Sequence, residues 1–389
     1  MSFIQLSIPG HGAYSLPPLP CLRLRFSLVP RQEAFLPSFK GSLLRGAFGH
    51  ALRRTVCVMG PQQPCPTCML RKQCVHPRLF ETLIEPDEPV PRFLRGLPTA
   101  PRPYIFEPFD EQRLYRPGES LRFDLILIGR ATELHPFAIF AVSQMAESGL
   151  GFKRIPFQLD KVLWQKAIEK AQVASKKWQV ANGKWQVAKS KEQTEKNKQK
   201  TANEKLQLAS EQEIEDEWRL LYDGATKRLL ETPTPQLLTT SHITNSALSL
   251  ATCHLRFLTP TRLKFNNTLT IDFSFRMLVF KMIRRVLELA HFHVPGVAID
   301  WEFHPLLVAA DAVKIVHRDL RWMDWERRSN RQKTEMLMGG FVGEMVLEGD
   351  LSPFVDLLRT CEVVHVGKGC VFGNGKIEAN FKQQKENSK

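Results

Sequence analysis

The sequence predicts an α+β protein in which one unit of strands and helices occurs twice. In each half of the chain, segments with strand or helix patterns follow one another in the order β-α-β-β-α-β. In both halves, glycines and a basic residue come directly before the last strand. Such a repeat indicates two ferredoxin-like domains, each a four-stranded antiparallel sheet with helices on one face.

The N-terminal half supplies the first series. Residues 21–29 alternate as a strand, and a helix is predicted within residues 37–56, with Gly46 and Gly49 inside it. Interior glycines cost a helix about 1 kcal/mol each relative to alanine, so something must approach this helix closely. Two strands, a helix and a last strand after a glycine turn complete the order, over residues 104–109, 119–129, 133–149 and 149–159.

The C-terminal half repeats the plan. Its segments are a strand, a long helix, a hairpin of two strands, a helix that follows Pro353, a glycine-rich loop and a final strand. The first strand spans 253–259, the long helix 272–293, the two hairpin strands 313–326 and 332–348, and the final strand 376–380. The glycines permit left-handed backbone and close approach of a ligand, and the interleaved lysines indicate an anionic one.

Two stretches interrupt this plan. Residues 57–80 are rich in cysteine, and residues 165–217 repeat near-identical charged heptads that predict a helical or disordered low-complexity insertion. The predicted organisation therefore begins with an N-terminal ferredoxin-like domain over 1–164 and the insertion over 165–217. A helix at 220–230 and a linker at 231–250, which together make up the segment 218–250, then lead to a C-terminal ferredoxin-like domain over 251–382. The insertion's lysines leave an RNA-contacting arm as an alternative.

Composition favours a basic cytosolic protein. The 389 residues carry 54 Lys and Arg against 40 Asp and Glu, a formal net charge of +14, which suits a nucleic acid or an acidic surface as partner. The sequence shows no signal peptide pattern and no apolar run of membrane-spanning length, so we expect a cytoplasmic protein with no membrane partner. The eight cysteines are then expected to be thiols or metal ligands rather than disulfides.

The cysteine-rich stretch is a candidate structural zinc site. Cys65 and Cys68 have the CxxC spacing with which two thiolates bind one metal, and Cys57 and Cys74 are near in sequence. Free thiols that hold a loop, or an iron–sulfur cluster, remain alternatives. A catalytic zinc would need an open coordination position, which a closed all-thiolate site lacks.

The glycine loop does not fit a nucleotide-binding motif. Its glycines follow GxGxxxG, the P-loop spacing is absent, and only fourteen residues remain after Gly375, too few to build a Rossmann unit behind it. A phosphate-rich polymer is therefore the favoured ligand, with a purely structural turn cluster as the alternative.

Three stretches carry a family resemblance: GSLLRGAFGHALRR at 41–54, CPTCMLRKQC with the following LFE at 65–81, and GGFVGEMVLEGDLSPFVDLLR with HVGKGCVFGNGK within 339–376. They resemble the RAMP superfamily and, within it, the CRISPR-associated endoribonucleases of the Cas6 family, which cut precursor CRISPR RNA within its repeats. The resemblance implies tandem ferredoxin-like domains, a CRISPR repeat RNA as partner, and cleavage with no catalytic cofactor. It does not cover residues 165–217.

Metal-independent cleavage of this kind uses the RNA's own 2′-OH. A base removes its proton, the oxygen attacks the adjacent phosphorus, an acid protonates the leaving 5′-oxygen, and a cation stabilises the phosphorane. The products are a 2′,3′-cyclic phosphate and a 5′-OH. The resemblance implies a catalytic histidine on the first helix, a place that His50 matches, with Arg54 and Lys40 as nearby cations. A histidine that only packs the helix is the alternative.

The residues expected to bind RNA lie mainly in the glycine loop and in the basic hairpin around residues 327–333, where Trp322 and Trp325 are interleaved with cations. They are Gly367, Lys368, Gly369, Gly373, Gly375, Lys376, His365, Arg154, Arg321, Arg327 and Arg328. A solvated hairpin whose tryptophans face the core is the alternative. The competing function is a non-catalytic RAMP subunit that binds RNA, with subunits of a CRISPR effector complex as its partners.

Overall fold

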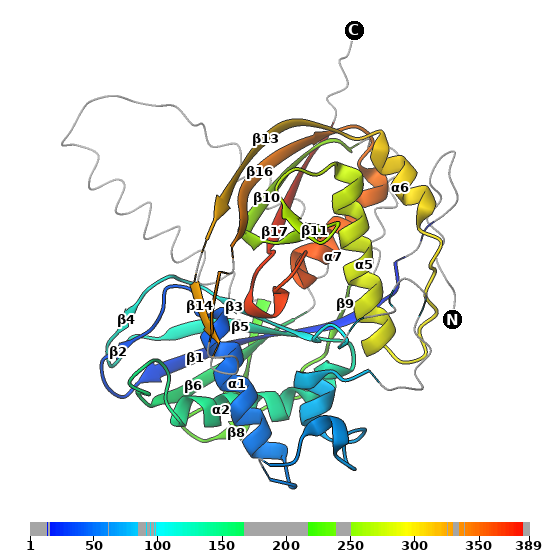
Figure 1. Cartoon of the computed structure of the whole chain (residues 1–389). Coiled ribbons are helices and arrows are strands. Elements are labelled where there is room, and N and C mark those ends of the chain that lie inside the picture. Colours follow the sequence, from blue (N-terminus) through cyan, green and yellow to red (C-terminus); the bar gives the residue numbers. More distant parts are fainter. Residues whose placement is uncertain are drawn as a thin grey trace, which may run out of the picture.

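A computed structural model of the chain describes residues 14–383, apart from positions 15, 61, 85–90, 92–93, 95–96, 98, 167–216, 239–249, 325, 330–333 and 338. The predicted charged insertion, residues 165–217, thus lies outside the described residues except at its two ends. In the described part the chain is a mixed α/β protein with antiparallel sheets, as the sequence predicted (Figure 1).

The N-terminal unit is built on one large antiparallel sheet. Its strands are β1 (Leu19–Pro30), β3 (Tyr104–Pro108), β5 (Leu121–Ile128), β6 (Phe157–Gln165), β7 (Trp218–Asp223), β8 (Arg228–Leu229) and β9 (Gln236–Leu238). The helices are α1 (Gly41–Val56) and α2 (His135–Glu147), the latter preceded by the 3₁₀ turn η4 (Gly129–Leu134). Two short strands, β2 (Ala34–Phe35) and β4 (Leu114–Tyr115), pair beside this sheet. Turns of the cysteine-rich stretch are η1 (Cys65–Thr67) and η2 (Pro77–Glu81).

The C-terminal unit has a smaller antiparallel sheet. Its strands are β10 (Leu250–Thr261), β13 (Lys314–Met323), β16 (Gly340–Glu348) and β17 (Ile377–Gln383). The helices are α5 (Phe275–His293), α6 (His304–Asp311) and α7 (Val355–Val364), with 3₁₀ turns η5 (Ser352–Phe354) and η6 (Cys370–Phe372). Two hairpins, β11 (Leu263–Phe265) with β12 (Thr268–Thr270) and β14 (Glu326–Ser329) with β15 (Thr334–Leu337), complete it.

The two sheets share one strand order. Neighbouring strands are β3-β5-β1-β6 in the first unit and β13-β16-β10-β17 in the second. In each series, the second, third, first and fourth strands of the chain lie side by side in that order. All of these pairs are antiparallel.

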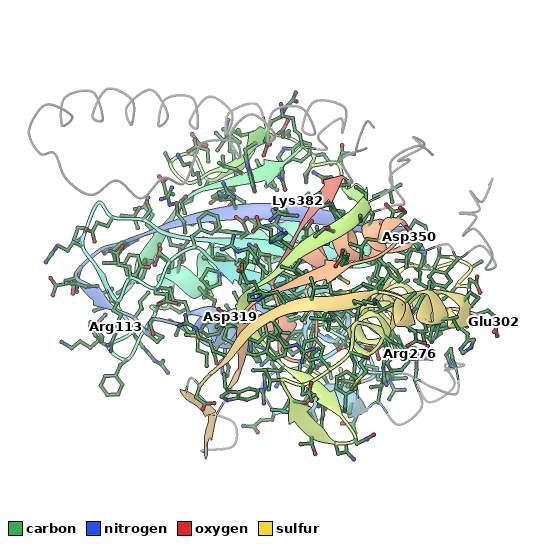
Figure 2. All side chains as sticks on the ribbon, turned by 90° about the horizontal axis from the view of Figure 1, so that it is seen from above. Arg113, Arg276, Glu302, Asp319, Asp350 and Lys382 are labelled. Atoms are coloured by element: carbon green, nitrogen blue, oxygen red, sulfur yellow. The ribbon has the colours of Figure 1, made fainter. Side chains whose placement is uncertain are left out.

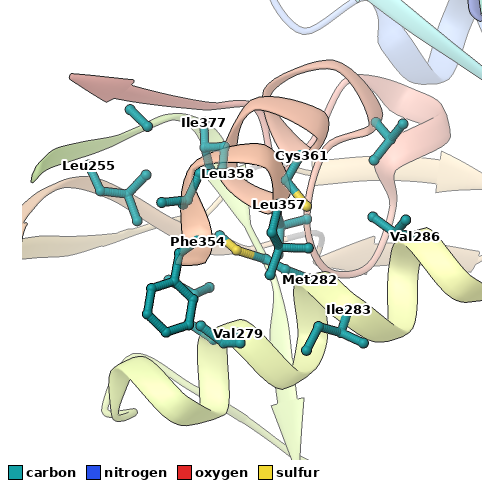
Figure 3. Packing of buried hydrophobic residues seen from close by; sticks show 14 of the residues in the cluster. Leu255, Val279, Met282, Ile283, Val286, Phe354, Leu357, Leu358, Cys361 and Ile377 are labelled. Atoms are coloured by element: carbon teal, nitrogen blue, oxygen red, sulfur yellow. The ribbon is translucent and has the colours of Figure 1, made fainter. Parts of the chain in front are cut away.

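The C-terminal core forms where α5 and α7 cover their sheet. Ser274 caps α5 by accepting a hydrogen bond from the Met277 backbone N–H at 3.3 Å, so the helix begins at Phe275 rather than near Asp272. Figure 3 shows the apolar faces of α5 and α7 packed together against the sheet residues Leu255 and Ile377. These buried side chains follow the helical spacing that predicted both helices.

Strand alternation divides the N-terminal sheet into two faces. One face, with Leu24, Phe26 and their neighbours, packs in a core with residues of α1 and α2. On the opposite face, Ile105 and Ile126 are fully buried in the same cluster as residues of α5 and α7. The C-terminal unit therefore packs on this part of the N-terminal sheet.

Two segments differ from their predicted structure. Residues 220–230, expected to be a helix, form parts of β7 and β8, because pairing with the exposed side of β6 buries Trp218 and Leu221. The predicted linker 231–250 contains β9, which pairs with β1, and the start of β10. Helix α6 was not predicted. None of the described helices is long and apolar enough to span a membrane.

Candidate functional site

The glycine loop between α7 and β17 has a backbone path that its glycines make possible. Gly367, Gly369, Gly373 and Gly375 all have positive φ angles, between 76° and 91°. A Cβ on Gly375 would lie 1.9 Å from the carbonyl oxygen of Val366. Glycine is therefore required here by the loop's own structure, whatever ligand it binds.

The inner half of the loop packs against the N-terminal unit. A Cβ on Gly373 would lie 2.6 Å from the carbonyl oxygen of Phe106 on β3, and one on Gly41, the first residue of α1, would lie 1.8 Å from that of Phe372. Figure 1 shows this loop, in red, between the two units. At Gly373, in the inner half of the loop, the backbone that approaches closely is thus that of β3 and not that of an RNA. Lys368, in the outer half of the loop, is exposed.

A buried carboxylate joins the loop to the other unit. Glu107 on β3 is only 4% exposed. Its Oε2 accepts hydrogen bonds from Arg23 Nη1 and Lys376 Nζ, both at 2.8 Å, and its Oε1 is 2.7 Å from His365 Nε2. Burial alone would raise the pKa of Glu107, but the charge of Arg23, followed by His365 and Lys376, holds that pKa well below its ordinary value.

His365 is a structural part of this network. Its side chain is fully buried, and its Nδ1 lies 2.9 Å from the carbonyl oxygen of Asn374. Both ring nitrogens therefore face acceptors, the carbonyl and the Glu107 carboxylate, and only the protonated imidazolium donates to both. His365 was expected to contact RNA, but in this structure it is closed off from solvent and holds the loop.

A second carboxylate extends the network along the sheet. Asp124 on β5, 1% exposed, accepts hydrogen bonds from Arg23 at 3.1 Å and from Arg25 at 2.9 and 3.2 Å. The guanidinium of Arg25 also lies 3.8 Å from the ring centroid of Trp218. Lys376 was expected to bind RNA, but its ammonium group pairs with Glu107 in this network. Both carboxylates of the network, Glu107 and Asp124, have cationic partners.

Cations crowd around the outer half of the loop. The Lys368 backbone N–H donates to the Arg262 carbonyl at 2.9 Å, which holds the loop against the strand that leads into β11. Burial, and then the charges of Lys264 and Arg262, lower the pKa of Lys368. Burial and the charges of Arg284 and Lys368 likewise lower the pKa of Lys281 on α5. Four cations from separate segments therefore share one region, which suits an anionic ligand.

Of these four cations, only Lys368 was predicted from the sequence to bind RNA. The other three, Arg262, Lys264 and Lys281, are spread over a loop, a short strand and a helix. Within its own segment, none of the three has a sequence pattern that indicates binding. The alternation of basic and apolar residues around Arg262 and Lys264 was the available signal, but by itself it does not distinguish a binding surface from a solvated strand.

Helix α1 presents His50 to solvent. His50 is exposed, so the packing alternative weighed for it does not apply in this structure. Gly46, one turn earlier, has no atom within 4 Å of the position a Cβ would take, while a Cβ on Gly49 would lie 2.0 Å from the Phe80 ring. The two glycines of this helix thus have different roles. Gly49 makes room for the Phe80 ring, and Gly46 leaves an open surface beside His50.

The two cations expected near His50 have different surroundings. Lys40 is fully buried, and its Nζ donates to the Asp110 carbonyl at 2.9 Å and to Asp110 Oδ1 at 3.1 Å. Burial lowers the pKa of Lys40, an effect that Asp110 opposes. Arg54 is exposed and donates to Ser148 Oγ at the end of α2. In this geometry Lys40 anchors the start of α1 and cannot contact a substrate, whereas Arg54 can.

The cysteine-rich segment lies beside the C-terminal end of α1. Cys65 Sγ is 3.4 Å from His76 Nδ1, and burial raises the pKa of the Cys65 thiol and lowers that of His76 to about 4. The charges of Cys57 and Cys74 also act on Cys65, so these residues are near one another. However, no group of three or more His, Cys, Asp or Glu side chains in the described residues is arranged to hold a metal. The zinc site therefore stays a prediction from the sequence spacing.

The remaining predicted RNA ligands lie elsewhere. Arg154 is exposed in the turn after α2 and has a positive φ of 48°. Arg321 is exposed on β13 with Trp322, which is 42% exposed and so does not face the core. The side chains of Arg327 and Arg328, as well as residue Trp325, lie outside the described part of the chain.

Residues 255–377 match the family model of the CRISPR-associated endoribonuclease Cas6. This range contains the glycine loop, the cation cluster around it, and the strands β13 and β16 of the C-terminal sheet. Over these residues the chain is similar to the Cas6 family. A second model, described as an N-terminal domain, matches residues 19–189. Among curated proteins, none matches the sequence.

Solved Cas6 structures align with most of this chain at low identity. A Cas6 product complex is 16% identical, with a TM-score of 0.47, over 93% of this chain and 100% of that one. A Thermus thermophilus Cas6 is 15% identical, with a TM-score of 0.42, over 95% and 100%. In a Cas6-RT-Cas1–Cas2 complex, 95% of this chain aligns with 29% of the matched chain, at 12% identity and a TM-score of 0.46. The similarity to Cas6 therefore rests on the family model of residues 255–377 rather than on these scores.

We predict that Glu107→Gln destabilises the protein by about 3–5 kcal/mol, because Arg23, His365 and Lys376 would then lack a buried counter-charge. The measurement is urea unfolding at several pH values. Since the folded pKa of Glu107 lies below the ordinary 4.5, its stabilisation is complete above about pH 5 and declines as the pH falls toward the folded value. The difference between wild type and variant should therefore narrow only below about pH 4.5.

Glu378→Gln is the matched control for this experiment. Glu378 pairs with Arg256 at 2.8 Å on the same protein, but both side chains are exposed, at 40% and 52%. Its loss should cost at most about 1 kcal/mol. Equal effects of the two substitutions would contradict the role assigned to Glu107.

Proposed function

We propose that this chain cleaves precursor CRISPR RNA within its repeats, without a catalytic metal, by attack of the 2′-OH on the adjacent phosphorus. The observation that carries the proposal is the match of residues 255–377 to the Cas6 endoribonuclease model. The exposed Lys368 and the half-buried cations around it support the proposal, because a polyphosphate chain needs several positive charges on one surface. The products would be a 2′,3′-cyclic phosphate and a 5′-OH.

His50 is the proposed general acid or base. It is exposed on α1, the open position of Gly46 leaves space beside it, and Arg54 is one turn further along the helix. A histidine can take the 2′-OH proton or supply a proton to the leaving 5′-oxygen near neutral pH. Arg54 would stabilise the charge that develops on the phosphorane. Lys40 is dropped from the proposed catalytic set because it is buried with Asp110.

The proposed RNA surface combines sequence and structural evidence. It includes Lys368 with Arg262, Lys264 and Lys281, whose mutual repulsion an RNA phosphate chain would relieve. Among the residues expected from the sequence, Arg154 and Arg321 are exposed and stay proposed ligands, and Arg327 and Arg328 stay predictions. The glycines act through the loop's shape, and Lys376 and His365 act by holding it.

We also propose that each unit is a ferredoxin-like domain. The support is the shared strand order, β3-β5-β1-β6 and β13-β16-β10-β17, with the helices α1 and α2 or α5 and α7 in the corresponding positions along the chain. In the N-terminal unit β7, β8 and β9 extend this sheet. The proposed partner is CRISPR repeat RNA, with other CRISPR proteins as further partners. A purely RNA-binding role is not favoured, since the matched family is one of endoribonucleases.

The first prediction from the proposed function concerns the cleavage reaction. We expect cleavage of the genomic repeat RNA at one position in excess EDTA, because the proposed chemistry uses only protein side chains and the RNA's own hydroxyl. A single 2′-deoxy substitution on the 5′ side of the scissile phosphate should abolish product. Denaturing gels of single-turnover reactions measure both. Cleavage of the deoxy substrate, or loss of cleavage in EDTA, would disprove the mechanism.

The second prediction concerns His50. His50→Ala should slow single-turnover cleavage by about 10²-fold or more, the usual scale for the loss of a general acid or base, with little change in RNA affinity. Because His50 is exposed, its removal should leave the melting temperature nearly unchanged.

His317→Ala, which removes an exposed histidine from β13, is the matched control and should cleave at the wild-type rate. If His50→Ala also cleaves at that rate, the acid or base is another residue.

The third prediction concerns the cysteines. We still propose from the sequence spacing a structural zinc held by Cys57, Cys65, Cys68 and Cys74, although the described residues show no group of three or more ligands arranged to hold a metal. Elemental analysis of purified protein should find about one zinc per chain, and its removal should lower the melting temperature. Metal-free protein that melts and cleaves like the untreated sample would favour thiols that merely hold the loop.

A further inference from the structure

The turn between α2 and β6 holds a phenylalanine in solvent. Phe152 is 98% exposed, more than any other large hydrophobic side chain that the structure describes. It lies in the segment Gly149–Ile155, which corresponds in chain order to the glycine loop of the C-terminal unit. A fully exposed aromatic ring gains nothing from the protein's own core, so its position calls for an explanation outside folding.

The turn itself is well fixed. Leu150 and Ile155 exchange both backbone hydrogen bonds, at 2.9 and 3.1 Å, and the Arg154 N–H donates to the Gly151 carbonyl at 3.2 Å. A Cβ on Gly149 would lie 2.1 Å from the Arg154 carbonyl oxygen, so only glycine allows this path. The backbone therefore presents Phe152 in a defined place, and its exposure is a built feature of the turn.

Positive charge flanks the ring. Lys153 and Arg154 follow it directly, both are exposed, and neither forms an ion pair with another described residue. Next to the turn is a second exposed ring, Phe35 on β2, which is 59% exposed and carries the Arg113 guanidinium 4.6 Å from its centroid. Figure 2 shows Arg113 at an outer corner of the N-terminal unit.

The turn that carries Phe152 lies directly against β2, which carries Phe35. A Cβ on Gly151 would lie 2.7 Å from the Phe35 carbonyl oxygen. The surface also adjoins the proposed catalytic helix, since Arg54 donates a hydrogen bond to Ser148, the residue before Gly149. Rings and cations thus alternate beside the C-terminal end of α1.

We propose that this surface, made of Phe35, Arg113, Phe152, Lys153 and Arg154, binds a single-stranded segment of RNA. Bases would stack on the two rings, and phosphates would contact the three cations. Separate rings with cations between them suit a nucleic acid strand better than a protein partner, which needs a continuous apolar patch. The proposal rests on the proposed function and adds to it a stretch of unpaired RNA next to the cleavage site.

The test compares three fluorescently labelled RNAs and five proteins. The RNAs are the repeat alone, the repeat with an unstructured uridine extension on its 5′ side, and the repeat with the same extension on its 3′ side. The proteins are wild type, Phe152→Ala, Phe152→Trp, Lys153→Ala and Phe140→Ala. Phe140 is a matched control, because it is a 54% exposed phenylalanine on α2. All five should melt at nearly the same temperature.

Phe152→Ala should weaken binding of an extended RNA by about 5-fold to 100-fold, the range for losing one stacked base. The repeat alone should be affected much less, Phe152→Trp should restore affinity, and Phe140→Ala should bind like wild type. Lys153→Ala should weaken binding of the extended RNA and reduce the dependence of log Kd on log salt by about 0.7, the slope for one single-strand phosphate contact.

Several results would overturn the proposal. One is equal affinity of wild type and Phe152→Ala for both extended RNAs, while wild type still cleaves the repeat; the proposed function would then stand alone. Another is Phe152-dependent binding to anionic phospholipid vesicles without any effect on RNA. If wild type neither binds nor cleaves repeat RNA, the proposed function fails first.

Discussion

The arrangement of the two units depends on one buried negative charge. The Glu107 carboxylate lies at the junction of β1, β3 and the glycine loop, and it accepts hydrogen bonds from Arg23, His365 and Lys376. A carboxylate removed from water is stable only when its lone pairs have donors in good geometry, so each donor segment is held in place by the others. His365 adds a further link, because its second nitrogen bonds the Asn374 carbonyl across the loop. The relative position of the sheets and the path of the loop are therefore coupled.

This coupling divides the glycine loop into two parts with different roles. The inner part closes on protein: Gly373 meets β3, and Phe372 meets the first residue of α1. The outer part carries Lys368 beside Arg262 and Lys264, and burial, followed by their like charges, lowers the pKa of Lys368. Unfavourable repulsion that a ligand relieves is typical of a binding surface, whereas fully compensated charge is typical of a structural network. By this criterion, binding belongs to the outer part and stability to the inner part.

The class of fold could be predicted from patterns within single segments. Features that depend on contacts between distant segments could not be predicted. The alternation of β1 and the helical spacing of α5 are local and were found directly from the sequence. Residues 220–230 were expected to be a helix that closes the insertion. The contact that makes their first part a strand is the pairing with β6, which cannot be read from the segment itself. The role of Glu107 was missed for the same reason, since its partner His365 is 258 positions away in the chain. Lys40 was proposed as a catalytic cation because it precedes α1, but its burial depends on Asp110, seventy positions later.

The proposed chemistry places a demand on the RNA that the protein alone does not meet. His50 is in solvent and forms no hydrogen bond or ion pair with other described residues. In water a proton transfer group gains little from nearby charges, because the high dielectric constant weakens them. The RNA itself must therefore cover α1 and exclude water before Arg54 can stabilise a phosphorane strongly. An RNA held only at Lys368 would be fixed at one place, whereas contacts at both the glycine loop and the C-terminal end of α1 would hold the strand along the helix. Activity would then require correct docking of the substrate, which is how a helix with an exposed histidine can cleave one position in a repeat and spare other RNA.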